Sequence, residues 1–315
     1  MINSSLEQIS YPLTPENLYD PIRYSLAAGG KRLRPVFALL ACNLFKDAVE
    51  AAINPAIAIE IFHNFTLLHD DIMDKSELRR NQPTVHIKWN ENVAILSGDA
   101  MLIKAYEYLV RSPEQLLPDI ITEFNKVALE VCEGQQLDMD FEMRDDVSVE
   151  QYLQMIGLKT AALIAGSLKI GAICGETTNE NVINLYEFGH NIGVAFQLQD
   201  DLLDVFADPK VFGKSSGNDI LSNKKTFLLL TAMKNAAGEL LTEINQWLSR
   251  SEFDKTEKVN AFIEIYNKLN IKQLTEDEIE KYYQKAMRYL ETITVATERK
   301  KVIKEFVVML MGRNK

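Results

Sequence analysis

Long apolar stretches at helical spacing are the feature that most limits how this chain can fold. In "SVEQYLQMIGLKTAALIAGSLKIGAICG" and "ENVINLYEFGHNIGVAFQLQDDLLDVF", apolar residues recur every three or four positions. Helices that are apolar on nearly every side have to be buried among other helices. Several further stretches share this spacing, and we find no convincing alternating strand pattern. The sequence therefore predicts an all-α fold, with a single domain over residues 1–315 that bundles about ten or more helices around a deep central cavity.

The bulk properties exclude several other classes of protein. A net charge of −11 disfavours a nucleic-acid partner. The N-terminal segment "MINSSLEQISYPLT" lacks the basic start and apolar run of a signal peptide, and Lys169 interrupts the stretch nearest in length to a membrane span. The three cysteines are widely spaced and form no CxxC pair, which is typical of buried thiols in a reducing compartment. We therefore expect a cytoplasmic protein with no membrane span.

Two acidic motifs interrupt the apolar stretches, "LLHDDIMD" and "FQLQDDLLD". Residues four apart share one face of a helix, so Asp70 and Asp74 point the same way, as do Asp200 and Asp204. At an effective dielectric constant of 20, two such charges repel each other by roughly 3 kcal/mol, so a nearby cation is needed. Oxygen donors without His or Cys favour Mg²⁺, with Mn²⁺ as an alternative, and Mg²⁺ commonly shares its shell with phosphates. The apolar flanks then suggest a diphosphate with an apolar tail.

Other interpretations of the acidic motifs are weaker. A single motif of this kind is often a solvated helix face, but two within apolar helices are hard to explain in that way. An EF-hand needs twelve-residue spacing and a central glycine, which are missing here. A di-iron bundle needs ExxH pairs, which are also missing.

Basic residues lie close to both motifs. The segment "GGKRLRP" carries Lys31, Arg32 and Arg34 at the expected start of a helix, which suits an anion, although a solvated basic turn is the alternative. Arg79 and Arg80 follow the first acidic motif, and their guanidinium groups suit diphosphate oxygens.

Three lysines accompany the second half of the pattern. Lys159 lies on a long apolar helix in "LKTA" and either extends outward or reaches into the cavity. Lys214 and Lys224 occur in "FGKSSGNDILSNKK", a glycine- and lysine-bearing loop that reads as a mobile flap over a site or as an ordinary surface loop. It does not match a Walker loop.

Taken together, these motifs resemble the trans-type isoprenyl diphosphate synthases of the polyprenyl synthetase family. The matching segments, in the family's order, are "GGKRLRP", "LLHDDIMD…LRR…PTVH", "EGQQLD", "LKTA" and "FQLQDDLLD…GK…D…NK", which span about Leu18 to Lys225. The resemblance implies the all-α isoprenoid synthase fold, usually as a homodimer, with the acids facing each other across a deep pocket. It also implies a prenyltransferase that joins isopentenyl diphosphate to an allylic diphosphate (dimethylallyl, geranyl or farnesyl).

The resemblance also implies a role for each matching residue. Asp70 and Asp74 would bind two Mg²⁺ ions and Asp200 a third, with Asp71, Asp201 and Asp204 as nearby ligands or supporting residues. The allylic diphosphate site would comprise Arg79, Gln135, Asp138, Lys159, Thr160, Gln197, Lys214 and Lys224. The isopentenyl diphosphate site would comprise Lys31, Arg34, His63 and Arg80.

The match has two departures from the family pattern. The stretch "KSSGND", which begins at Lys214, is one residue longer than in some relatives. The C-terminal "GRNK" is also less basic than the tail that often covers the site in this family.

Product length should depend on the floor of the pocket. Phe65 lies five residues before Asp70, about 7.5 Å along the helix axis, where its ring can stop a growing chain, and Thr66 beside it is smaller. In the family, one aromatic residue here without an insertion in the acidic motif resembles synthases of C20 products. We therefore expect geranylgeranyl diphosphate, with C15 farnesyl diphosphate as the alternative, unless Phe65 is only a core residue. More distant alternatives are a class I terpene cyclase and a non-catalytic subunit of a heteromeric synthase.

Overall fold

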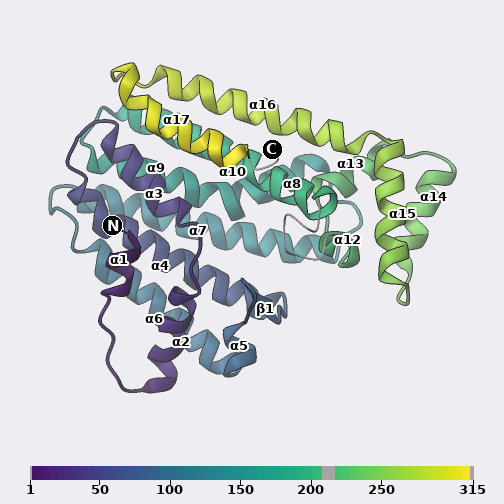
Figure 1. Ribbon diagram of the computed structural model, residues 1–315, viewed down its shortest axis with the longest axis horizontal. Coiled ribbons are helices and arrows are strands. Elements are labelled where there is room, and N and C mark those ends of the chain that lie inside the picture. Colours follow the sequence, from purple (N-terminus) through teal and green to yellow (C-terminus); the bar gives the residue numbers. More distant parts are fainter. Residues whose placement is uncertain (1, 208–216, 313–315) are drawn as a thin grey trace. The chain divides into compact units, whose positions relative to one another are not determined.

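The computed structural model describes residues 2–207 and 217–312, and nearly all regular structure in that part of the chain is helical (Figure 1). The strands among the described residues are β1 (Leu78–Arg79) and β2 (Gln82–Pro83), which pair as a small antiparallel hairpin. The predicted all-α fold class is confirmed.

The contacts between residues group the chain into two compact units, and each unit is assembled from segments that are distant in sequence. Unit 1 comprises Met1–Ala128, Leu163–Tyr186 and Thr292–Glu305, and unit 2 comprises Leu129–Ala162, Glu187–Glu291 and Phe306–Lys315. The single domain and its central cavity stay predictions. The first acidic motif belongs to unit 1 and the second to unit 2.

Unit 1 is organised around α4 (Glu50–Met73), which packs against α3 and α6. Its other complete elements are α1 (Ile2–Glu7), α2 (Glu16–Ala27), α3 (Leu33–Asn43), the β1–β2 hairpin, α5 (Val85–Lys88) and α6 (Glu91–Leu109). The side chain of Asn90 starts α6 by accepting a hydrogen bond from Val93 N at 2.9 Å. At Gly98 a Cβ atom would lie 2.3 Å from Nε2 of His69, so only glycine lets α6 approach the last turns of α4 so closely.

Unit 2 contains α8 (Val149–Ile156), the π-helical turn η1 (Gly157–Ala161), α12 (Asn218–Leu221), α13 (Phe227–Asn235), α14 (Glu239–Ser249) and α15 (Lys255–Lys268). Five helices contribute residues to both units: α7 (Leu117–Glu142), α9 (Ala162–Cys174), α10 (Asn179–Phe206), α16 (Ile271–Thr292) and α17 (Thr297–Met311). Ser148 and Gln151 form a reciprocal capping box that fixes the start of α8.

Two glycines hold η1 between its neighbours in unit 2. At Gly134 on α7, a Cβ atom would lie 2.2 Å from the backbone nitrogen of Lys159. At Gly193 on α10, a Cβ atom would lie 2.5 Å from Cα of Ala161. Backbone contact on both sides therefore fixes the turn that carries Lys159, and single π turns of this kind are common at functional sites.

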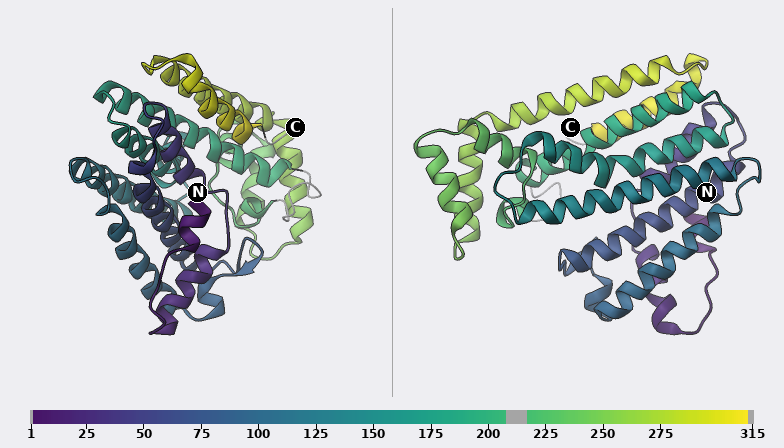
Figure 2. Two further views of the ribbon diagram at one scale, coloured as in Figure 1. Left: turned by 60° about the vertical axis from the view of Figure 1, so that its left-hand side comes forward. Right: turned by 180° about the vertical axis from the view of Figure 1, so that it is seen from behind.

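The polar C-terminal region packs more tightly than its sequence suggested. The polar sequence of residues 250–277 is compatible with a separate, looser sub-bundle. Instead, Phe262, Ile265 and Ile271 are buried in the same core cluster as Leu202 and Leu228. Helices α14 and α15 lie side by side, as Figures 1 and 2 both show.

Two helical segments have the length and composition to cross a bilayer. They are Glu50–Met73 and Val149–Cys174, and 61% and 72% of their most apolar windows are buried inside the protein. Packing within the protein accounts for this apolar character, as in the core helices of a folded domain.

Candidate functional site

The first acidic motif lies at the C-terminal end of α4 and has a buried member. Asp71 is 4% exposed, and its Oδ1 accepts a hydrogen bond from Nε of Arg79 at 2.7 Å. Asp70 is half-buried, with its Oδ2 3.6 Å from Nη2 of Arg79, and Asp74 is exposed just past the helix. Burial raises the pKa of Asp71, although the neighbouring Arg79 acts in the opposite direction. Arg79 therefore anchors the inward-facing acid and also lies near Asp70.

A basic cluster lies in the same unit, and Gly30 makes room for part of it. Arg80 donates a hydrogen bond to the carbonyl of Gly29. A Cβ atom at Gly30 would lie 2.7 Å from Nη2 of Arg80, and the backbone of both glycines has positive φ. Both glycines are thus explained by their positive φ, and Gly30 also by the guanidinium group of Arg80 that lies against it.

His63 joins this cluster as a neutral side chain. Nη1 of Arg34 lies 3.0 Å from Nε2 of His63, and because arginine can only donate, Nε2 accepts and the ring proton is on Nδ1. Burial lowers the pKa of His63 well below its usual value, and four surrounding arginines lower it further. Burial also lowers the pKa of Arg34, to about 10. Lys31 is exposed on the same loop.

Arg32 has a different role from its neighbours in the motif. It points inward, forms a buried ion pair of 2.5 Å with Glu60, and donates to the carbonyl of Leu26 at 2.7 Å. Asn64 also donates to Glu60, at 3.0 Å. The sequence grouped Arg32 with the anion-binding residues, but its guanidinium group is committed to Glu60. An isolated acid within "AIAIEIF" was the available signal for this pair.

Phe65 belongs to a group of aromatic rings in unit 1. Its ring centroid is 4.7 Å from that of His69 and 5.6 Å from that of Phe62, which in turn contacts Phe124 at 5.2 Å. Thr66 donates to the carbonyl of His63 at 2.8 Å. The rings meet in tilted and edge-on arrangements, which fix the position of Phe65 one to two turns before the first acidic motif.

The second acidic motif repeats this arrangement in unit 2. Asp201 is 4% exposed, and it accepts hydrogen bonds from the hydroxyl of Tyr152 and from Nε2 of Gln197, the latter at 2.9 Å. Thr160 donates to Oε1 of the same Gln197 at 3.0 Å. Asp200, next to Asp201, is exposed. A partly buried hydrogen-bond chain thus joins η1 to the inward-facing acid.

Asp204 and Asp219 connect this motif to the following segment. Oδ2 of Asp204 accepts from the backbone nitrogen of Asp219 at 3.0 Å, which fixes the start of α12. Burial raises the pKa of Asp219 to about 6. Burial and the nearby Asp219 raise the pKa of Asp201 to about 7. The positive charge of Lys224 acts in the opposite direction and lowers the pKa of both acids. Asp219 and Tyr152 were not among the predicted site residues, although Asp219 is the "D" between flap and "NK" in the matched pattern.

Lys159 points toward acids rather than outward. Its Nζ lies 2.6 Å from Oδ2 of Asp138 on α7, and Gln135 lies one turn earlier on the same helix. The pairing disfavours an outward orientation of Lys159, and its position in the predicted cavity stays a prediction. Lys214 lies outside the described residues.

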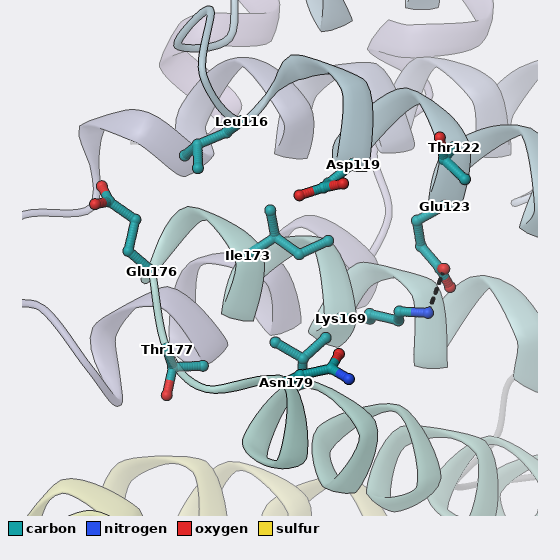
Figure 3. A pocket seen from close by; sticks show the side chains of 10 residues that line it. Leu116, Asp119, Thr122, Glu123, Lys169, Ile173, Glu176, Thr177 and Asn179 are labelled. Carbon is teal, nitrogen blue, oxygen red and sulfur yellow. Dashed lines mark ion pairs between the residues drawn. The ribbon is translucent and has the colours of Figure 1, made fainter.

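A separate polar pocket of about 410 Å³ lies in unit 1 (Figure 3). It is lined by residues at the start of α7, the end of α9 and the start of α10, and none of the predicted site residues lines it. Within it, Lys169 pairs with Glu123 at 2.6 Å, which explains how a charge is tolerated in the most apolar stretch of the sequence.

Asp219→Asn should stabilise the metal-free protein most at neutral pH. An acid with a raised pKa keeps its proton in the folded state after the unfolded state has lost it, so the contribution of Asp219 to stability falls as pH rises from about 4 to about 6. Asparagine cannot ionise, so the gain in free energy of unfolding should grow over this range and reach about 1–3 kcal/mol.

Urea unfolding at pH 4.5 and 7.5 in the presence of a chelator measures this gain. The exposed Asp277 provides the control variant Asp277→Asn. A gain for Asp219→Asn that is equal at both pH values would contradict the raised pKa values.

Comparisons with known proteins agree on one family. The family model for polyprenyl synthetase matches residues 15–266. A geranylgeranyl diphosphate synthase from Methanosarcina mazei is 41% identical over 236 residues, which cover 74% of this chain and 72% of that protein. A geranylfarnesyl diphosphate synthase from Natronomonas pharaonis is 40% identical over 250 residues, covering 74% of this chain and 73% of that protein.

Solved structures are similar over nearly the whole chain. A crystal structure of a geranylgeranyl pyrophosphate synthase has a TM-score of 0.93 and 42% identity, covering 99% of this chain and 96% of that one. A geranylgeranyl pyrophosphate synthase from Corynebacterium glutamicum, complexed with isoprenyl diphosphate and magnesium, has a TM-score of 0.86 and 28% identity, covering 99% of this chain and 94% of that one. The motifs, the all-α fold and these similarities lead to one conclusion: the chain belongs to the polyprenyl synthetase family of prenyltransferases.

Proposed function

We propose that this chain condenses isopentenyl diphosphate with an allylic diphosphate, releases diphosphate, and makes geranylgeranyl diphosphate as its main product. The observation that carries the proposal is the repeated motif architecture: in each acidic motif a buried aspartate is held by protein donors, while its neighbour is more exposed. The C20 product rests on Phe65 and on relatives named for that product. Farnesyl diphosphate is the alternative.

A divalent metal ion is used throughout this family, and the donor set here fits Mg²⁺. Asp70 and Asp74 would hold two ions and Asp200 a third, with Asp71 and Asp204 in support, and Mn²⁺ could substitute. Among residues 2–207 and 217–312, no group of three or more acid, His or Cys side chains is placed to hold a metal ion. That fits an ion that takes its remaining ligands from water and diphosphate. When bound, the ions would neutralise charge on the leaving diphosphate.

The basic residues would divide between two diphosphates. Arg79 lies near Asp70, Lys159 is paired with Asp138, and Lys224 lowers the pKa of Asp201 and Asp219. These cations would stabilise the charge that develops as the allylic C–O bond breaks. Gln135, Asp138, Thr160, Gln197 and Lys214 complete the proposed allylic site. Isopentenyl diphosphate would be held by Lys31, Arg34, His63 and Arg80.

The remaining steps follow from binding and exclusion of water. An allylic cation placed next to the isopentenyl double bond is attacked by it, because holding both reactants removes most of the entropic barrier. Apolar walls keep out the water that would otherwise capture the cation. The final proton goes to the departing diphosphate, since the motifs contain no better-placed base: His63, although neutral, already accepts from Arg34.

Two rival functions are disfavoured by particular features. A class I terpene cyclase normally carries an N/D-x-x-S/T-x-x-x-E second motif and needs no isopentenyl site, whereas this chain has a second DDxxD and the Arg34–His63 cluster. A non-catalytic subunit could lose acids without consequence, whereas both motifs are intact here.

A homodimer is also part of the proposal, with α6 as the contact. Leu96, Ile103 and Val110 follow one another at seven-residue spacing, and each is more than half exposed. Such an apolar stripe on one helix face is typical of a surface that packs against another helix. The predicted cytoplasmic location is consistent with three free cysteines, Cys42, Cys132 and Cys174.

Purified protein incubated with Mg²⁺, isopentenyl diphosphate and dimethylallyl diphosphate should give a C20 diphosphate by mass spectrometry. Asp70→Ala should lower kcat by at least about 10³-fold, because a proposed metal ligand is lost. Glu77→Ala, which removes an exposed acid nearby, is the matched control. Cyclised products formed without isopentenyl diphosphate would favour the cyclase, and an inactive wild type would favour the non-catalytic subunit.

Phe65→Ala should lengthen the product beyond C20, because the ring that ends the proposed channel is removed. The same assay measures this, with Phe45→Ala as a control that deletes a half-buried ring elsewhere in unit 1. An unchanged product spectrum would mean that Phe65 is only a core residue.

Replacing Leu96 and Ile103 together by Asp should convert a dimer to a monomer in analytical ultracentrifugation, because charges would face the apolar partner. The double variant Val302→Asp with Val308→Asp places the same charges on exposed positions of α17 and should leave the dimer intact. Wild-type protein that sediments as a monomer would refute this part of the proposal.

A further inference from the structure

The segment over residues 217–226 follows the second acidic motif and carries charged residues close to it. Asp219 and Lys224 lie on it, joined through the backbone by a 2.9 Å hydrogen bond from Lys224 N to Asp219 O. At its start, the carboxylate of Asp204 accepts from the Asp219 backbone at 3.0 Å and from the Asn218 side chain at 3.4 Å. One end of this segment is therefore fixed by the second motif itself.

The other end is held by a lysine from α15. Lys258 is fully buried, and its Nζ donates to Oδ1 of Asn223 at 2.6 Å and lies 3.5 Å from the carbonyl of Leu221. Asn223 has a left-handed backbone with φ of 57° and also donates to the carbonyl of Leu248 on α14 at 3.2 Å. Hydrogen bonds to α14 and α15 therefore hold the turn directly before Lys224, and these two helices contact each other (Figures 1 and 2).

Burial of the Lys258 ammonium group costs free energy unless hydrogen bonds replace those that it makes with water. Among the described residues, the hydrogen-bond acceptors of its Nζ are neutral oxygens, and the centre of the Phe253 ring lies 4.1 Å from Nζ. A buried ammonium is tolerated only where hydrogen bonds compensate its lost hydration. Here those bonds go to the turn, where a leucine or methionine would pack without them.

Packing behind the segment leaves it little freedom. The cavity between it and the core measures about 10 Å³ and is lined by residues of α10, α13, α14 and α15. That volume holds at most about one water molecule. A shift of the turn would thus depend on the hydrogen bonds of Lys258 and Asn223, since the core behind it is already full.

We propose that Lys258 is a positioning residue: through Asn223 it holds the turn that presents Lys224 to the allylic diphosphate. The role rests on the proposed function and deepens it, because it gives the C-terminal helices α14 and α15 a part in substrate binding. Lys258 itself touches no substrate.

The variant Lys258→Met keeps the length and apolar stem of the side chain but removes the donor. We expect KM for dimethylallyl diphosphate to rise about 10-fold, the loss of roughly one hydrogen bond to a charged group. KM for isopentenyl diphosphate should stay unchanged, because the residues proposed for it lie in unit 1. A loss of folded protein would instead lower kcat without separating the two KM values.

Three further variants sharpen the test. Lys258→Arg should keep KM for dimethylallyl diphosphate close to the wild-type value, because arginine retains hydrogen-bond donors. Lys268→Met, on the exposed face of α15, should leave this KM unchanged. Asn223→Ala should give the same rise in KM from the other side of the contact, and combining it with Lys258→Met should add little more. If Lys258→Met does not fold, Asn223→Ala carries the test alone.

Amide hydrogen exchange separates this proposal from the proposed function. In Lys258→Met, amides of residues 221–224 should exchange faster whatever the substrate is. Unchanged exchange, or equal changes in both KM values, would overturn the positioning role. Wild-type protein that forms no prenyl product would overturn the proposed function instead, while the exchange result would still report whether Lys258 holds the turn.

Discussion

A carboxylate buried in an apolar helix bundle is stable only where cations or hydrogen-bond donors compensate for the loss of water. This constraint shapes both acidic motifs. On a helix, the first and last aspartates of DDxxD share a face, and the second is turned about 100° away from the first. In both motifs the second aspartate is the buried one: Asp71 is held by Arg79, and Asp201 by Tyr152 and Gln197. The two motifs thus use the same geometry with different donors.

The anchoring of the second aspartate leaves the first in a different environment. Asp200 is exposed beside the buried Asp201, and Asp70 is only half-buried beside Asp71. A buried acid with a raised pKa, such as Asp201, is poorly suited to be ionised without a nearby positive charge. The more exposed acids are better placed to ligate an ion, so we regard Asp71 and Asp201 as supports that orient the helix end.

Glycines have a comparable role next to the basic residues. Gly30 leaves room for the guanidinium group of Arg80 against the loop, and Gly134 and Gly193 allow the π turn with Lys159 to pack at backbone distance. In each case the residue without a Cβ atom is what lets a cation reach its position. A methyl group at any of these sites would push the backbone or the cation away.

Much of the molecule could be predicted from sequence because it depends on period and spacing. Helical periodicity gave the all-α class, and the order of the motifs gave the family. Contacts between distant segments could not be predicted in this way. Arg32 pairs with Glu60, although its basic neighbours Lys31 and Arg34 are expected to bind anions. Lys258 contacts the 221–223 turn from a stretch whose polar sequence suggests loose packing. Lys159 was undecided because a lone lysine on an apolar helix does not reveal whether an acid faces it.

The most direct test of the account is a crystal structure of the protein grown with Mn²⁺ and inorganic diphosphate, using anomalous scattering to locate the metal. The account predicts Mn²⁺ within coordination distance of the carboxylates of Asp70 and Asp74 and of Asp200, with diphosphate oxygens completing the shell. Metal peaks at neither motif, or diphosphate bound without metal, would contradict it.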